Sequence, residues 1–299
     1  MTPNNPAQRR PIVASISSST TFMLFLVTMT VLRFGSWNVC GLAGEARLAH
    51  VVQDFENYHL SVVGIQETKV RSSRIETVPG GHKLILFDQY HGQWHGGLGF
   101  LINRDFTVNV KSYKQISDRV AYLDAELPAS SPDKPPTHLR LINCYSPTNP
   151  KSILNPLLAQ RFYDELSLAL DVPARYELWI LGDFNAKIGK RPLDDPVYGI
   201  NEIMGSYSIG RRNENGRRLA DFCITNSLFI ANSAFKHSSR HISTRTGWVK
   251  EKKSGCTRPY FSQIDYILCR SRSKSFLTDA RAYAGTTHRS DHKLVIATV

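Results

Sequence analysis

Apolar and polar residues follow two different rhythms along this chain. Short apolar runs bounded by turn-forming residues are typical of buried strands, whereas apolar residues three or four positions apart are typical of helices. Helical spacing predicts helices at residues 45–58, 157–170 and 215–226. The apolar runs predict strands at residues 30–39, 60–66, 82–87, 97–103, 120–126, 139–145, 178–182, 228–231, 263–269 and 293–299. Strands outnumber helices and many neighbouring strands are joined by turns, which favours a mixed α/β sandwich over a purely parallel sheet.

The N-terminal segment differs from the rest of the chain. Its first residues are rich in Pro, Asn and Ser, and the apolar run at residues 22–32 is too short to span a bilayer. Two arginines precede this run, so it resembles the apolar part of a signal peptide, although no clear small-residue cleavage site follows it. We expect a flexible leader at residues 1–29 and one domain at residues 30–299, with a signal peptide as the alternative.

The charge of the chain is unevenly distributed. The net charge is +12, and residues 200–299 contain 17 basic and 7 acidic side chains. A hydrophobic content of 41% excludes a disordered tail protein, and the positive charge favours a nucleic acid or an anionic membrane surface as partner. The five cysteines form no CxxC pair, so we expect reduced thiols in an intracellular protein, with no disulfide-linked partner.

Polar side chains occur at the ends of several predicted strands, where a buried strand alone would not place them. Each has an ordinary explanation by itself, such as a turn or a solvated strand end. Together they indicate a site, because active sites of layered α/β folds collect at strand ends and in the loops beyond them. Carboxylate oxygens are also ligands that Mg²⁺ prefers alongside phosphate oxygens. These residues are Asn38, Glu67, Tyr145, Asp183, Asn185, Asp265, Asp291 and His292.

Six short segments resemble one known group of enzymes in their order along the chain. They are SWNV at residues 36–39, GIQET at 64–68, NCYSPT at 143–148, GDFNAKIG at 182–189, QIDYIL at 263–268 and SDHKLV at 290–295. In this order they resemble the endonuclease/exonuclease/phosphatase superfamily, also called the exonuclease III-like fold, over about residues 32–299. NENGRRLADFC at residues 213–223 is most similar to endonuclease domains of non-LTR retrotransposons and to the related craniofacial development protein 2-like proteins. The resemblance implies a four-layer α/β sandwich, with two packed mixed β-sheets flanked by helices.

The resemblance implies a divalent metal at the strand ends. We expect Mg²⁺, with Mn²⁺ as the alternative. Glu67 would bind it, helped by Asn38 and Asp291 directly or through water. In-line hydrolysis of a phosphodiester needs charge neutralisation on the phosphate oxygens, and a carboxylate-bound metal supplies it.

The same resemblance implies catalytic roles for the remaining strand-end residues. Asp183 would orient and deprotonate the attacking water, with Asn185 fixing the position of this water. His292, polarised by Asp265, would hydrogen-bond the scissile phosphate or help to activate the water. Tyr145 would donate to a phosphate oxygen. The negative charge of Asp265 should favour the imidazolium form of His292.

A basic segment at residues 236–258 favours a DNA nuclease over the lipid- and inositol-phosphate-directed members of the superfamily. The segment is rich in Lys and Arg, contains Glu251 as its single acidic residue, and includes Trp248 among the basic positions. A basic hairpin with an aromatic side chain suits the backbone and groove of a duplex, whereas a solvated surface loop is the alternative. The expected nucleic-acid contacts are Arg211, Arg212, Arg245, Trp248, Lys250, Lys252, Lys253 and Arg258.

These observations predict a Mg²⁺-dependent endonuclease of retrotransposon origin that cuts DNA and leaves a 3′-hydroxyl. We expect a monomeric, intracellular and nuclear protein with DNA as its partner and no membrane association. The alternatives are a catalytically silent, domesticated DNA- or chromatin-binding protein, and a phosphoinositide or sphingomyelin phosphodiesterase of the same fold. No reverse transcriptase region follows His292, so we expect either a solitary endonuclease domain or a fragment of an element.

Overall fold

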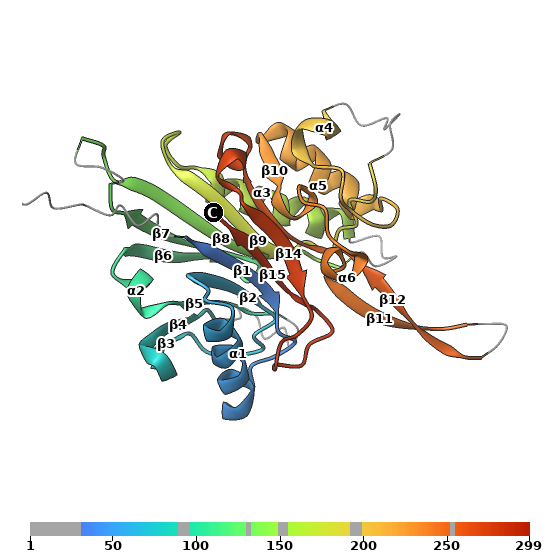
Figure 1. Cartoon of the computed structure of the whole chain (residues 1–299), viewed down its shortest axis with the longest axis horizontal. Coiled ribbons are helices and arrows are strands. Elements are labelled where there is room, and N and C mark those ends of the chain that lie inside the picture. The colour runs from blue at the N-terminus through green and yellow to red at the C-terminus, as the bar shows by residue number, and fades with distance from the viewer. Residues whose placement is uncertain (1–30, 89–95, 130–132, 149–154, 192–198, 252–254) are drawn as a thin grey trace, which may run out of the picture. The chain divides into compact units, whose positions relative to one another are not determined.

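Two parallel strand pairs, each joined by a helix, form the centre of the structure (Figure 1). The first unit is β1 (Arg33–Asn38), α1 (Glu45–Asn57) and β2 (Val62–Gln66), and the second is β8 (Thr137–Tyr145), α3 (Asn155–Leu170) and β9 (Glu177–Asp183). The structure, a computed structural model, describes residues 31–88, 96–129, 133–148, 155–191, 199–251 and 255–299. The predicted leader at residues 1–29 lies outside these residues. The parallel pairing places the carboxyl ends of both strands of each pair at the same edge of their sheet.

Each parallel pair lies inside a larger mixed sheet. The seven-stranded sheet has the order β14 (Asp279–Tyr283), β15 (Leu294–Thr298), β1, β2, β5 (Leu98–Ile102), β4 (His82–Leu86) and β3 (Arg74–Val78). The six-stranded sheet has the order β10 (Leu228–Ile230), β13 (Asp265–Arg270), β9, β8, β7 (Val120–Leu127) and β6 (Val110–Ser117). A separate hairpin of β11 (Arg245–Lys250) and β12 (Thr257–Ser262) projects beyond them (Figure 1). Both large sheets are therefore mixed, as predicted.

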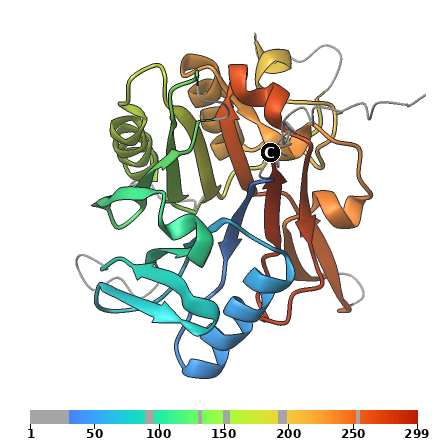
Figure 2. The same cartoon turned by 60° about the vertical axis from the view of Figure 1, so that its left-hand side comes forward.

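Short and long helices complete the fold. Besides α1 and α3, they are α2 (Arg104–Thr107), α4 (Ile200–Ile203), α5 (Glu214–Thr225), α6 (Ser239–Ile242) and the 3₁₀ turns η1 (Pro79–Gly81), η3 (Ala231–Ser233) and η4 (Ser271–Phe276). α1 buries Val51, Val52 and Phe55 against the seven-stranded sheet, whereas α3 and α5 cover the outer face of the six-stranded sheet. Figure 2 shows α1 and α3 on opposite sides of the two sheets. The predicted four-layer α/β sandwich is confirmed.

The space between the sheets changes from apolar to polar along the strands. On β1 the side chains that face the second sheet are Phe34, Ser36 and Asn38, because alternate residues of a strand share a face. The inward side chains of β9 change from apolar to polar in the same way, from Trp179 and Leu181 to Asp183. The apolar residues at one end of these strands form the central core. The polar residues at the other end are buried as well, and they form the base of the candidate site.

Apart from the two strands of the hairpin, three strands that the apolar runs did not predict lie at sheet edges. They are β3, β6 and β14, whose apolar alternation is weak: most of β3 is exposed, and the inward positions of β14 are Ala280 and Ala282. The other predicted strands and the three long helices are present, with ends shifted by a few residues. No disulfide bond joins the five cysteines, all of which lie within the described residues. Among the described residues, none of the helices has the length and apolar character needed to cross a bilayer.

Asn143 joins the two sheets beneath the site, and its removal should destabilise the fold. Its Nδ2 donates to the carbonyls of Ile65 (2.9 Å) and Gly99 (2.8 Å), and its Oδ1 accepts from Gln66 Nε2 at 2.7 Å. We expect Asn143→Ala to lower the free energy of unfolding by about 3 kcal/mol, because these buried groups lose their partners. Urea denaturation measures the change. Gln160→Ala, at an exposed position of α3, is the control, and equal losses in the two variants would contradict the prediction.

Candidate active site

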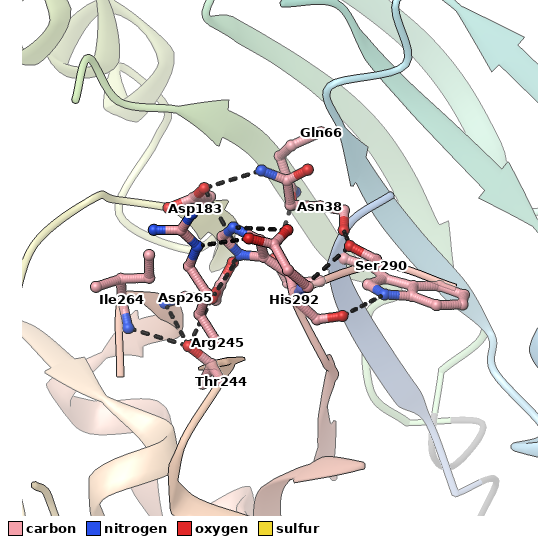
Figure 3. A network of polar contacts seen from close by, with 12 residues as sticks. Asn38, Gln66, Asp183, Thr244, Arg245, Ile264, Asp265, Ser290 and His292 are labelled. Atoms are coloured by element: carbon pink, nitrogen blue, oxygen red, sulfur yellow. Dashed lines mark hydrogen bonds and ion pairs between the residues drawn. The ribbon is translucent and has the colours of Figure 1, made fainter. Parts of the chain in front are cut away.

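Three side chains from different parts of the chain meet in a buried cluster at the polar edge (Figure 3). Asp183 ends β9, Asp265 begins β13, and His292 precedes β15. His292 Nδ1 lies 2.9 and 3.1 Å from the two carboxylate oxygens of Asp265, and 3.8 Å from Asp183 Oδ2. The antiparallel register of β9 and β13 pairs Asp183 directly with Asp265. Two carboxylates and one imidazole therefore share a site with almost no access to solvent.

The protonation states of this cluster depend on burial and on mutual charge. Burial alone would lower the pKa of His292, but Asp265 and Asp183 outweigh it and raise this pKa to about 9. Burial and the nearby Asp265 raise the pKa of Asp183 to about 7, against the opposing effect of His292. A buried charge persists when an opposite charge compensates it. The cluster thus contains an imidazolium and a carboxyl group that titrates near neutral pH.

Asn38 connects this cluster to a third carboxylate, that of Glu67. Its Nδ2 lies 3.0 Å from Asp183 Oδ2 and 2.9 Å from Glu67 Oε1, so one amide group touches both. Tyr145 donates its hydroxyl to the same Glu67 oxygen at 2.9 Å, and Lys69 Nζ lies 3.1 Å from the other oxygen. Burial would raise the pKa of Glu67, but these three donors outweigh it and lower the pKa. Glu67 therefore remains ionised.

Asp291 is the fourth carboxylate at this edge and is more accessible than the others. Arg245 Nε lies 2.9 Å from its Oδ2, and the Cys40 thiol lies 3.1 Å from its Oδ1. Burial would raise the pKa of Asp291, but the Cys40 hydrogen bond, His292 and Arg245 together lower it. Burial raises the pKa of the Cys40 thiol to about 11. Asp291 is therefore an anion, while Cys40 remains a neutral thiol at neutral pH.

The loop after β9 holds Asn185 in place behind Asp183. The Asn185 amide N–H donates to Asp183 Oδ1 at 2.9 Å, and its side chain donates to the Ser146 carbonyl at 2.9 Å. Asn185 adopts a φ of 45°, and Glu67 a φ of 52°, in the left-handed region that is costly for residues other than glycine. Both strained residues lie at the site, where surrounding hydrogen bonds compensate the cost.

Comparison with known proteins places this geometry in a family. The sequence profile of the Endonuclease/Exonuclease/phosphatase family matches residues 35–292, a range that contains every residue of the site described above. The chain belongs to this family. Its fold is therefore one used by nucleases and phosphatases, as the motif order predicted.

Several relatives and solved structures are similar to this family member. Craniofacial development protein 2 of Bos taurus is 29% identical over 269 residues, which cover 88% of this chain and 40% of that protein. The same protein of Tragulus javanicus is 30% identical over 264 residues, with 88% and 41% covered. The chain thus spans about two-fifths of the length of these relatives.

Two solved structures share the fold at low sequence identity. The endonuclease domain of TRAS1, a telomere-specific non-LTR retrotransposon, is 14% identical with a TM-score of 0.56, covering 90% of this chain and 98% of that one. The APE2 catalytic domain of Xenopus laevis is 17% identical with a TM-score of 0.62, covering 89% and 91%. These similarities show the architecture of the family.

The NENG motif, Asn213–Gly216, restrains the loop that follows Asp183 through hydrogen bonds to its backbone. Asn213 caps α5: its Oδ1 accepts from the Gly216 amide at 2.8 Å and from the Lys187 amide at 2.9 Å. Asn215 Nδ2 donates to the carbonyls of Asn185 (3.2 Å) and Pro147 (3.3 Å). A side chain at Gly216 would collide with the Lys187 carbonyl, so only glycine fits there. The motif therefore positions the loop that carries the catalytic candidates.

The expected nucleic-acid contacts fall into several environments. Trp248 is 68% exposed on the hairpin, with Lys250 and Arg258 also exposed. Arg245 lies at the hairpin base, next to Asp291. Arg211 is exposed, whereas Arg212 uses its Nε to brace the Ile188 carbonyl at 2.9 Å. Lys252 and Lys253 lie outside the described residues. The hairpin is present as expected, and the nucleic-acid role of each residue stays a prediction.

Sequence reasoning did not identify three residues that shape the site. Lys69 follows Glu67 by two positions, and this short spacing was an available signal for its ion pair. Thr244 donates to Asp265 Oδ2 at 2.5 Å and accepts from the Asp265 amide, although 21 positions separate them. Cys40 contacts Asp291, from which 251 positions separate it. Contacts of the last two kinds have no local pattern in the sequence.

The Asp265 carboxylate should set the protonation of His292. In Asp265→Asn we expect the pKa of His292 to fall by about one to three units, because the anion that favours the imidazolium is lost. Titration of the histidine ring signals by NMR measures both proteins. Thr244→Ser, which keeps the hydroxyl that contacts Asp265, should leave the His292 titration near that of the wild type. An unchanged midpoint in Asp265→Asn would contradict this assignment.

Proposed function

We propose that this protein is a Mg²⁺-dependent endonuclease that hydrolyses DNA phosphodiester bonds and leaves a 3′-hydroxyl. The observation that carries the proposal is the buried cluster at one edge of the sandwich, in which His292 Nδ1 lies 2.9 Å from Asp265 and 3.8 Å from Asp183, a carboxyl group whose pKa is raised by burial and by Asp265. A general base works best with a pKa near the operating pH, and an imidazolium can stabilise phosphate charge. The membership in a nuclease and phosphatase family supports this reaction class.

The oxygen donors at this edge fit a hard divalent cation. Glu67 and Asp291 are ionised, and Asn38 contributes an amide oxygen beside them. Each carboxylate is paired with a cationic side chain, Lys69 or Arg245, which shows that the edge attracts positive charge. We infer that Asn38, Glu67 and Asp291 would hold Mg²⁺ or Mn²⁺, which would neutralise charge on the phosphate.

A second group of possible ligands, the Asp183, Asp265 and His292 cluster, fits a metal less well. A histidine must be neutral to bind a metal, whereas the two carboxylates hold His292 in its charged form. Its Nδ1 also already faces Asp265. This cluster therefore serves proton transfer and charge stabilisation in the proposed mechanism.

The side chains divide the reaction between them. Asp183 accepts a proton from the water that attacks phosphorus, and the Asn185 loop fixes Asp183 for this step. The P–O3′ bond breaks as the new P–O bond forms, and the departing O3′ takes up a proton to become the 3′-hydroxyl. The His292 imidazolium, held by Asp265, stabilises the negative charge on the phosphate oxygens. Tyr145 contacts Glu67 in this structure, and its hydroxyl would turn to a phosphate oxygen when DNA binds.

The hairpin supports DNA as the substrate. It presents Trp248 and Lys250 on one face and Arg258 on the other, because Arg258 pairs with Val249, and its base is hydrogen-bonded to Asp291. Basic residues suit phosphates, and an exposed aromatic ring suits base stacking or groove insertion. The similarity to the TRAS1 endonuclease domain supports a retrotransposon origin, and we propose a nuclear location because the substrate is DNA.

Loss of Asp183 should abolish cleavage. We expect the wild type with Mg²⁺ to nick supercoiled plasmid DNA, and Asp183→Asn to reduce the rate at least about 10²-fold through loss of the general base. Extension of the nicked ends by a DNA polymerase tests for the 3′-hydroxyl. Asp164→Asn, on the exposed face of α3, is the control. Turnover of sphingomyelin or phosphoinositides without nicking, or DNA binding without any cleavage, would instead support the two alternative functions.

Charge removal on the hairpin should weaken DNA binding in a salt-dependent manner. In an Asp183→Asn background, Lys250→Gln and Arg258→Gln each remove one cation that neutralises a DNA phosphate. Each variant should therefore reduce the slope of log affinity against log salt by about 0.9. Fluorescence anisotropy with a labelled duplex gives this slope. Lys111→Gln, on β6, is the control because it removes an exposed charge from another sheet edge. If all three variants behave alike, the hairpin does not bind the DNA backbone.

A further inference from the structure

A cationic side chain of this protein already occupies one of the proposed metal ligands. Arg245 contacts Asp291 Oδ2 through its Nε at 2.9 Å, and the Cys40 thiol faces the other carboxylate oxygen at 3.1 Å. Both oxygens of Asp291 therefore have partners from the protein itself. Burial would lower the pKa of Arg245, but Asp291 outweighs it and raises the pKa, so the guanidinium remains charged.

The backbone fixes this contact, so it does not depend on the flexible arginine side chain alone. The Thr246 amide donates to the Asp291 carbonyl at 2.9 Å, and the Lys293 amide donates to the Thr244 carbonyl at 2.7 Å. These two bonds flank an antiparallel bridge between Arg245 and His292. The first residues of β11 thus pair with residues 291–293 as a short extra strand, which places the Arg245 side chain next to the Asp291 carboxylate.

A divalent cation that uses Asp291 must approach this guanidinium. The cation and the guanidinium repel each other, because both are positively charged. Solvent screens this repulsion less at a partly buried position than in bulk water. The cation would also replace Arg245 as the partner of Asp291 Oδ2. Arg245 and the metal are therefore alternatives for one carboxylate oxygen.

We propose that Arg245 competes with the divalent metal for Asp291, and that metal entry frees its guanidinium to bind the phosphate of the substrate. This inference rests on the proposed function. Without metal, Arg245 keeps the ionised Asp291 compensated and oriented. With metal, the guanidinium is displaced beside the scissile phosphate, and its rigid set of N–H donors matches phosphate oxygens. The protein thereby exchanges one cation for another at Asp291.

Cation binding tests this competition without reference to cleavage. We expect Arg245→Gln to bind Mn²⁺ about fivefold more tightly than the wild type, the effect of removing one partly exposed ion pair. The free Mn²⁺ signal in EPR titrations gives the dissociation constants. Arg245→Lys, which keeps the charge, should remain near the wild type. Circular dichroism checks that each variant is folded.

Arg281 offers a closely matched control. Its Nε lies 3.0 Å from Asp279 Oδ2 and it is 36% exposed, compared with 2.9 Å and 35% for Arg245. It lies on β14, where Asp279 pairs with Thr298 at the end of the sheet opposite to the site. Arg281→Gln should leave Mn²⁺ affinity unchanged. An equal effect at both positions would mean that net charge alone acts, and this would overturn the proposal.

A second measurement follows the ion pair directly. In a ¹H–¹⁵N spectrum of arginine Nε groups, Mg²⁺ should shift the Arg245 signal, assigned from its absence in Arg245→Lys, and leave the Arg281 signal in place. An Arg245 signal that does not move under saturating Mg²⁺ would overturn the displacement. If the wild type binds Mn²⁺ and nicks DNA but Arg245→Gln binds Mn²⁺ with unchanged affinity, only this inference fails. If the wild type binds no Mn²⁺, the proposed metal site fails as well.

Discussion

Asp183 and Asp265 are two buried carboxyl groups beside one imidazole ring, and the protonated ring of His292 compensates negative charge on them. The three residues come from β9, from β13 and from the segment before β15, so this compensation requires the two sheets to pack in one particular register. The buried polar residues of these strands are therefore stable only when all of them are present, because each is a partner of another. The electrostatics of the site and the packing of the sandwich depend on the same arrangement.

Local patterns in the sequence were sufficient to predict the strands in which an apolar run is followed at once by polar or turn-forming residues. β1, β2 and β9 were predictable in this way, and the polar residues that follow them, Asn38, Glu67 and Asp183, do lie together. β3 was not predictable, because most of its residues are exposed and an edge strand of this kind shows little alternation. The pairing of Thr244 with Asp265 was not predictable either, since it follows from the tertiary arrangement alone. Sequence reasoning thus located the polar strand ends but not the side chains that restrain them.

The NENG segment shows how a motif that identifies a subfamily can have a mainly structural basis. Asn213, Asn215 and Gly216 bind or accommodate backbone groups of the loop after Asp183. Arg212 braces the same loop through the Ile188 carbonyl. The strained backbone of Asn185 is supported from one side by this segment and from the other by Ser146. The geometry around Asp183 therefore depends on α5, an element on the outer layer of the sandwich.

The backbone pairing between the start of β11 and residues 291–293 divides the hairpin into two parts with different freedom to vary. At its base, insertion or deletion of one residue would change the register of the residues beside His292 and would disturb the site. Beyond Trp248 and its partner Pro259, no such bond to the site is present among the described residues, so the length and composition of the tip can change while the base stays fixed. Under the proposed function, contacts of the tip with DNA can therefore change without altering Asp183, Asp265 or His292.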